Sequence, residues 1–123
     1  MDRPPAAALD STPQVSIDAA TISKTISRAL SMGAAPLDLD ALVELYNELC
    51  EHIGFLLPKP CETTRHAAPA DAEAHRLRAR LAGIGRQARL PLPRAGLLVH
   101  VQVQLLARDC QWLLARHTAE DGR

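Results

Sequence analysis

The stretch between Leu42 and Leu56 limits the fold of this chain more than any other part of the sequence. Its apolar residues follow one another in alternating steps of four and three: Leu42, Tyr46, Leu49, Ile53 and Leu56. That repeat places them on one side of an α-helix and leaves the other side to polar residues. We therefore predict a helix from about Leu39 to Leu57, with Asp38 as its N-cap and Pro58 as its stop.

Composition favours helices along the rest of the chain as well. Ala and Leu together number 40, whereas the β-branched Val and Ile number only 10, a ratio that suits helices better than sheets. Apolar residues at helical spacing predict three more helices, at about Ile17 to Met32, Pro69 or Ala70 to Ala88, and Ala95 to Thr118. Pro58 to Ala68 is expected to be a linker. The prediction is an all-α protein, a four-helix, largely antiparallel bundle.

The ends of the chain are expected to lie outside this bundle. We predict a disordered lead over residues 1–15, one helical-bundle domain over 16–118 and a disordered tail over 119–123. The lead has charges and prolines but no continuous apolar core, so it does not resemble a signal peptide. No apolar run approaches the ~18 to 20 residues that cross a bilayer, so no membrane contact is expected. Three widely spaced cysteines indicate reduced thiols and a cytoplasmic protein.

The last predicted helix contains a competing strand pattern. Val99 to Leu105, VHVQVQL, alternates apolar and polar residues as a half-buried strand does. Val99, Val103, Leu106, Cys110 and Leu113 also form a helical stripe, and no other segment supplies a strand partner. We therefore favour the helix.

Polar residues form two lines on this helix, with Val101, Leu105 and Trp112 between them. One line contains His100, Gln104, Arg108 and Gln111, and the other Gln102, Asp109 and Arg116. A helix that is apolar on more than one side is expected either at the centre of the bundle or at a dimer interface. Trp112 is expected to be a packing residue or an interface anchor, and a homodimer is predicted.

The two halves of the chain carry opposite charge, although the whole is neutral. Residues 1–62 contain 4 basic and 9 acidic residues, a net charge of −5, and residues 63–123 contain 10 basic and 5 acidic residues, a net charge of +5. These surfaces either pair within a subunit or across a dimer, or the arginines form a docking patch for an acidic partner. Nucleic acid is a less favoured partner, because the arginines surround a helix that also supplies core residues and no recognition-helix motif is present.

Few residues are arranged for chemistry. Glu44, Glu48 and His52 share one side of a helix and could hold a divalent metal, but the Glu-x-x-His spacing of di-iron bundles is missing, so a solvated face is expected. Cys50 and Cys110 lack a base at a suitable spacing and are expected to be inert. We predict no catalytic residue, no metal and no cofactor.

The segment Leu97 to His117, LLVHVQVQLLARDCQWLLARH, is the most distinctive part of the chain. Together with ARLAGIGRQAR at Ala79 to Arg89, TISKTISRAL at Thr21 to Leu30 and HIGFLLP at His52 to Pro58, it resembles a family of small helical proteins of actinomycetes described as "natural product biosynthesis protein". The resemblance implies a cytoplasmic role in secondary metabolism or its regulation. It carries over no catalytic residue, and it adds weight to a shared surface on the last helix.

We predict from these patterns a non-enzymatic interaction or accessory protein that binds a protein partner. Its expected binding residues lie on the last two helices: His100, Gln102, Gln104, Arg108, Asp109, Trp112, Arg76 and Arg80. The alternative is a small enzyme or ligand-binding bundle acting on a natural-product intermediate. In that case His100, Asp109 and Arg108 would supply acid, base and anion-holding groups.

Overall fold

The computed structural model describes residues 18–31 and 38–121, and these residues form α-helices and no β-strand. The helices are α1 (Ala19–Leu30), α2 (Leu39–Leu56), α3 (Pro58–Arg65), α4 (Ala72–Ala88) and α5 (Gly96–Asp121). The all-α class is therefore confirmed. The segment Val99 to Leu105 is helical throughout, which settles the choice between strand and helix.

Aspartate side chains start three of these helices. Asp18 accepts a hydrogen bond from the Thr21 N–H, and Asp38 accepts one from the Asp40 N–H. Asp71 accepts from both Glu73 and Ala74. Each carboxylate satisfies backbone N–H groups that have no partner within the helix, and its charge lies at the positive end of the helix dipole.

The expected linker after Pro58 is wrong, because most of it is helical. Residues 58–65 form α3, which continues α2 after a break at Leu57. The Leu57 N–H donates to the Ile53 carbonyl at 2.9 Å, and the Cys61 N–H donates to the Leu57 carbonyl at 3.2 Å. Pro58 occupies the first turn of α3, where the missing N–H would have had no helical partner. Pro58 therefore marks a kink after which the chain continues as a helix. Counted together, α2 and α3 form one kinked member of a four-helix bundle.

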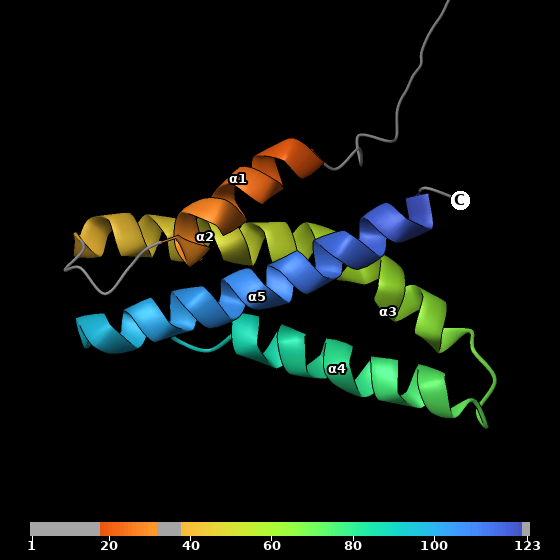
Figure 1. Ribbon diagram of the computed structural model, residues 1–123. Helices are drawn as coiled ribbons and strands as arrows, with labels where there is room; N and C mark the ends of the chain where they lie inside the picture. Colours follow the sequence, from red (N-terminus) through yellow and green to blue (C-terminus); the bar gives the residue numbers. More distant parts are fainter. Residues whose placement is uncertain (1–17, 32–37, 122–123) are drawn as a thin grey trace, which may run out of the picture.

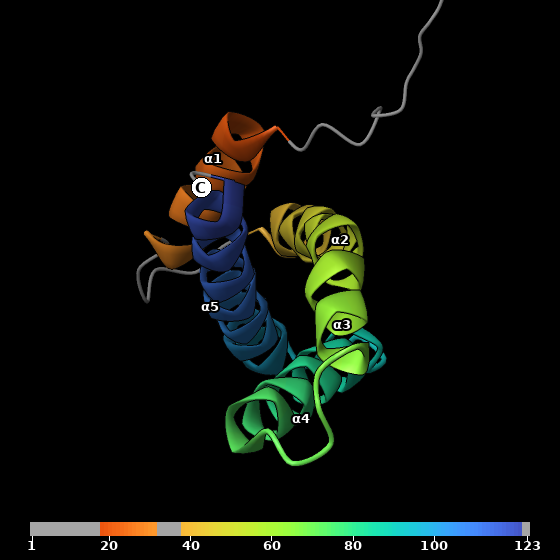
Figure 2. The ribbon, with the colours of Figure 1, turned by 90° about the vertical axis from the view of Figure 1, so that its right-hand side faces the viewer.

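The bundle is built around α2 and α5. Both contact α1 on one side and α4 on the other, whereas α1 and α4 do not contact each other. Figure 2 shows this arrangement with α1 at the top and α4 at the bottom. Consecutive long helices run in opposite directions, so α2 and α5 run in the same direction, from left to right in Figure 1.

The core lies between these two central helices. Leu49 and Ile53 of α2, with Val103 and Leu106 of α5, are almost completely buried. The predicted inner stripe of α5, defined as Val99, Val103, Leu106, Cys110 and Leu113, is buried along its whole length. These side chains place the buried side of α5 against the rest of the bundle and fix which side of that helix faces outward.

Some expectations fall on residues that the structure does not describe. The predicted lead over 1–15, the ends of the first helix at Ile17 and Met32, and residues 122–123 lie outside the described ranges. At the other end α5 extends to Asp121, so residues 119–121 of the expected tail are helical.

Candidate functional site

The outward side of α5 carries a second line of apolar residues. Leu98, Val101, Leu105 and Trp112 are separated by three, four and seven residues, which places them on one side of the helix. We call these four residues the outer stripe. Leu98, Val101 and Leu105 remain 55%, 47% and 45% exposed, and Leu97 beside them is more exposed still. The bundle therefore covers the inner stripe of α5 and leaves Leu98, Val101 and Leu105 about half exposed, whereas Trp112 is half-buried against the core.

Two arginines lie over the indole ring of Trp112. The guanidinium carbon of Arg80, on α4, is 4.8 Å from the ring centroid, and that of Arg116 is 5.6 Å away. A guanidinium over an aromatic face is attracted by the ring quadrupole, by about 0.5–1 kcal/mol at exposed sites. Trp112 therefore joins the outer stripe to Arg80 of α4.

Arg80 also approaches the carboxylate of Asp109. One guanidinium nitrogen lies 4.0 Å from Oδ1, with the Arg80 side chain 50% exposed and the Asp109 side chain 20% exposed. Burial raises the pKa of Asp109, and the attraction of Arg80 only partly opposes that rise. The contact is therefore a weak ion pair, and half of the Arg80 side chain stays available to solvent.

The structure brings three of the predicted binding residues together, namely Arg80, Asp109 and Trp112. Two others lie beside them on the same side. Arg108 is exposed between Leu105 and Trp112, and Arg76 is exposed one turn before Arg80 on α4.

The remaining predicted residues lie apart from this cluster. Gln102 is buried at the contact between α4 and α5, where its side chain is hydrogen-bonded to Gln87. His100 and Gln104 are half-buried on the other flank of α5, and the His100 Nε2 has no hydrogen-bond partner among the described residues. The site prediction named polar and charged residues together with Trp112, and it left out the exposed leucines and valine. Their three-and-four spacing was the available signal.

One comparison with known proteins assigns the chain to a family. Residues 20–122 match the model of a family of unknown function, DUF6415. The chain belongs to the DUF6415 family. Searches of the curated proteins and of the solved structures find no match for this DUF6415 protein.

A buried polar cluster joins α1 to α2 in this DUF6415 protein. The His52 Nε2 lies 3.1 Å from the Thr25 hydroxyl oxygen, and that hydroxyl lies 3.3 Å from a carboxylate oxygen of Glu48 and 3.2 Å from the Thr21 carbonyl. Arg28 reaches the same Glu48 oxygen at 3.5 Å. Thr25 is 2% exposed, so its hydroxyl cannot meet a substrate.

The expected solvated face of Glu44, Glu48 and His52 is therefore wrong for two of its members. His52 is buried and Glu48 is half-buried against α1, and of the three only Glu44 is exposed. The cluster is a structural contact that fixes how α1 lies on α2. Among the described residues, no group of three or more His, Cys, Asp or Glu side chains could hold a metal ion.

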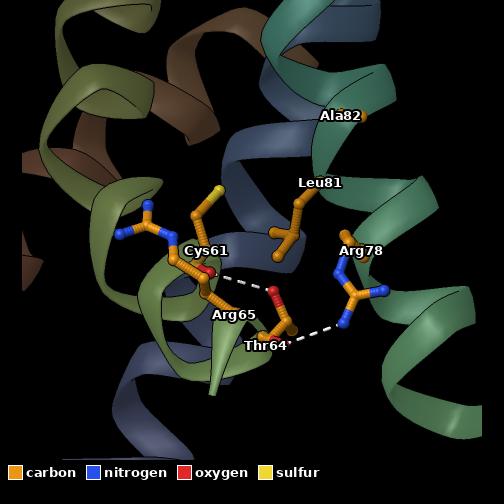
Figure 3. A pocket seen from close by; sticks show the side chains of 6 residues that line it. All are labelled: Cys61, Thr64, Arg65, Arg78, Leu81 and Ala82. Atoms are coloured by element: carbon orange, nitrogen blue, oxygen red, sulfur yellow. Dashed lines mark hydrogen bonds between the residues drawn. The ribbon is translucent and has the colours of Figure 1, made fainter. Parts of the chain in front are cut away.

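A small pocket opens between α3 and α4 of the DUF6415 protein (Figure 3). Its volume is about 240 Å³, and its lining consists of Cys61, Thr64, Arg65, Arg78, Leu81 and Ala82. Arg78 donates a hydrogen bond of 2.9 Å to the Thr64 carbonyl, and the Arg65 guanidinium points away from Leu81. Ligand sites need several convergent polar groups in a larger cavity. This pocket offers neither, and we do not assign it a function.

Among the described residues, no helix combines the length and the apolar character needed to cross a bilayer.

Proposed function

We propose that this DUF6415 protein is a non-enzymatic accessory protein that binds a protein partner through the outer stripe and the arginines beside it. The observation that carries the proposal is that α5 is apolar on two sides, whereas the bundle buries only one of them. Of the seven large apolar residues that are exposed in the described ranges, four lie within residues 97–105 of α5. An exposed apolar patch of this kind, bordered by charged residues, is typical of a protein-binding surface.

The positions of the candidate catalytic groups support this proposal over an enzyme. His100 and Asp109 are nine residues apart on one helix, which rotates them by about 180° relative to each other. They therefore lie on opposite sides of α5 and do not converge on one reacting atom. The Cys110 thiol is buried, and burial raises its pKa to about 12, so it is a poor nucleophile at neutral pH.

We further propose that the partner acts in secondary metabolism or its regulation, and that the complex forms in the cytoplasm. The resemblance of residues 97–117 to proteins described as "natural product biosynthesis protein" supports the first part. The three cysteines, all unpaired, support the second.

Site-specific photo-crosslinking in the native host tests the proposed function. A photoreactive amino acid at Val101, on the outer stripe, should give a crosslink to one specific protein. The same amino acid at Asn47, an exposed position on α2, should not. Crosslinks of equal pattern from both positions, or none from Val101, would contradict a partner at this surface.

A further inference from the structure

We infer that the outer stripe binds an acidic amphipathic helix of the partner, an inference that rests on the proposed function. Together with Arg108, the stripe has the spacing of a coiled-coil seam, because Leu98, Val101, Leu105, Arg108 and Trp112 follow in alternating steps of three and four. From Leu98 to Trp112 the helix rises about 21 Å. A partner helix of about four turns would cover that length and place its own apolar residues between those of the stripe.

Arginines outnumber carboxylates beside the outer stripe. Between Glu73 and Asp109 the chain contains seven arginines and no Asp or Glu. Of these, Arg80 lies over Trp112, and Arg76 and Arg108 are exposed within one turn of Arg80 and Trp112. Arg78 instead bonds to Thr64 of α3. Two carboxylates lie near the stripe and each is next to an arginine: Asp109, which is 20% exposed, is 4.0 Å from Arg80, and Glu120 is 3.9 Å from Arg116. A helix with glutamate or aspartate flanking its apolar side therefore complements this surface, and a basic helix does not.

Arg108 decides between an acidic partner and a second copy of the chain. It is exposed within the outer stripe, three residues after Leu105 and four before Trp112. Two copies of α5 could pair in antiparallel orientation with Leu98 to Leu105 of each covered by the other. Arg108 of one copy then faces a residue between 91 and 102 of the other copy, and that segment contains no carboxylate. In a parallel pair Arg108 faces itself. Self-pairing therefore places Arg108 opposite itself or opposite a segment without a carboxylate, whereas an acidic helix places a carboxylate there.

A designed peptide and the only tryptophan of the chain test this inference. The peptide is a 21-residue helix with leucine at its seam positions, glutamate at its flanking positions and no aromatic residue. The repulsion between its glutamates keeps it monomeric. Trp112 is the single tryptophan, so its fluorescence reports binding at the stripe directly. We expect saturable binding at low salt that is at least tenfold tighter than that of a matched peptide with lysine in place of glutamate, and that weakens as salt is added.

Variants of the full chain locate the binding site. Val101→Glu and Arg108→Glu should each weaken binding of the glutamate peptide at least tenfold, and both positions are exposed, so the fold should persist by circular dichroism. Asn47→Glu, on α2, is the matched control and should bind as the unmodified chain does. Equal binding of the two peptides, or no binding of either, would overturn the inference.

Analytical ultracentrifugation tests the competing hypothesis, in which a second copy of the chain covers the outer stripe. If the unmodified chain dimerises and Val101→Glu makes it monomeric, a second copy covers the stripe and the inference is wrong. The chain could also be a monomer that crosslinks to a cellular protein through Val101 but does not bind the glutamate peptide. That result would support the proposed function and overturn the inference that the partner supplies an acidic helix.

Discussion

Gln87 and Gln102 join α4 to α5 by two hydrogen bonds between the same pair of residues. The Gln87 side-chain amide donates to the side-chain carbonyl of Gln102 at 2.8 Å, and the Gln102 amide donates to the main-chain carbonyl of Gln87 at 3.2 Å. Gln102 is buried, so its amide has little access to water. This pair holds the end of α4 beside the first turns of α5. Arg80 and Trp112 lie further along the same two helices, so the pair helps to position Arg80 beside the outer stripe.

We predict that removing this pair destabilises the bundle. Gln102→Leu should lower the free energy of unfolding by roughly 1–3 kcal/mol, because the Gln87 groups lose their partners in a partly buried setting. Urea denaturation of Gln87→Leu, Gln102→Leu and the double variant completes a double-mutant cycle. The double variant should lose less than the sum of the two single losses. Strictly additive losses would mean that the two amides do not stabilise each other.

Two leucines test the distinction between the covered and open sides of the bundle. Leu49 is fully buried between α2 and its neighbours, so Leu49→Ala should lower the free energy of unfolding by roughly 2–5 kcal/mol. Leu98 on the outer stripe is exposed, and Leu98→Ala should change stability by less than about 0.5 kcal/mol. Thermal and urea unfolding measure both. A large loss at Leu98 would show that this side chain is buried in the free protein.

The thiol of Cys110 should resist modification in the native state. It is completely buried, and burial raises its pKa to about 12, so at pH 8 only about one thiol in ten thousand is ionised. Mass spectrometry after maleimide treatment should find Cys61, which is half-buried, labelled well before Cys110. Adding denaturant should make Cys110 react at the rate of an ordinary thiol. Rapid native labelling of Cys110 would contradict its position in the core.

Asp109 should make the stability of the protein depend on pH. Burial raises its pKa above the ordinary value of 3.8, despite the nearby Arg80. A raised pKa in the folded state means that the contribution of this group is fully present below about pH 3.8 and is lost as the pH rises through the folded value. Asn resembles the protonated form, so the stability of Asp109→Asn relative to the unmodified chain should increase between pH 3 and pH 7. A constant difference between the two proteins would contradict the raised pKa.

The sequence predicts the helices well because their signals are local. The apolar repeat around Leu49 and the cap at Asp38 depend only on neighbouring residues, and both are present in the structure. The prolines after Leu57 misled the prediction, since a proline that stops one helix also suits the first turn of the next.

The contacts of the candidate site depend on how the helices cross in space, and this does not follow from neighbouring residues in the sequence. Thr25 is buried against His52 because of the way α1 crosses α2, and Gln102 is buried because α4 ends beside it. Neither crossing follows from spacing along one helix. Trp112 and Arg80 were both predicted as binding residues, but their contact across two helices became visible only in three dimensions.

The position of α5 in the chain sets the order in which the protein can fold during translation. The most extensive helix–helix contact of the bundle is between α2 and α5, and about 65 residues separate the end of α2 from the end of α5. At 5–20 residues per second, the ribosome takes roughly 3–13 s to add them. For that time α2 can contact α1, α3 and α4, but it lacks the helix against which most of its apolar side packs, so the bundle closes only after α5 has emerged.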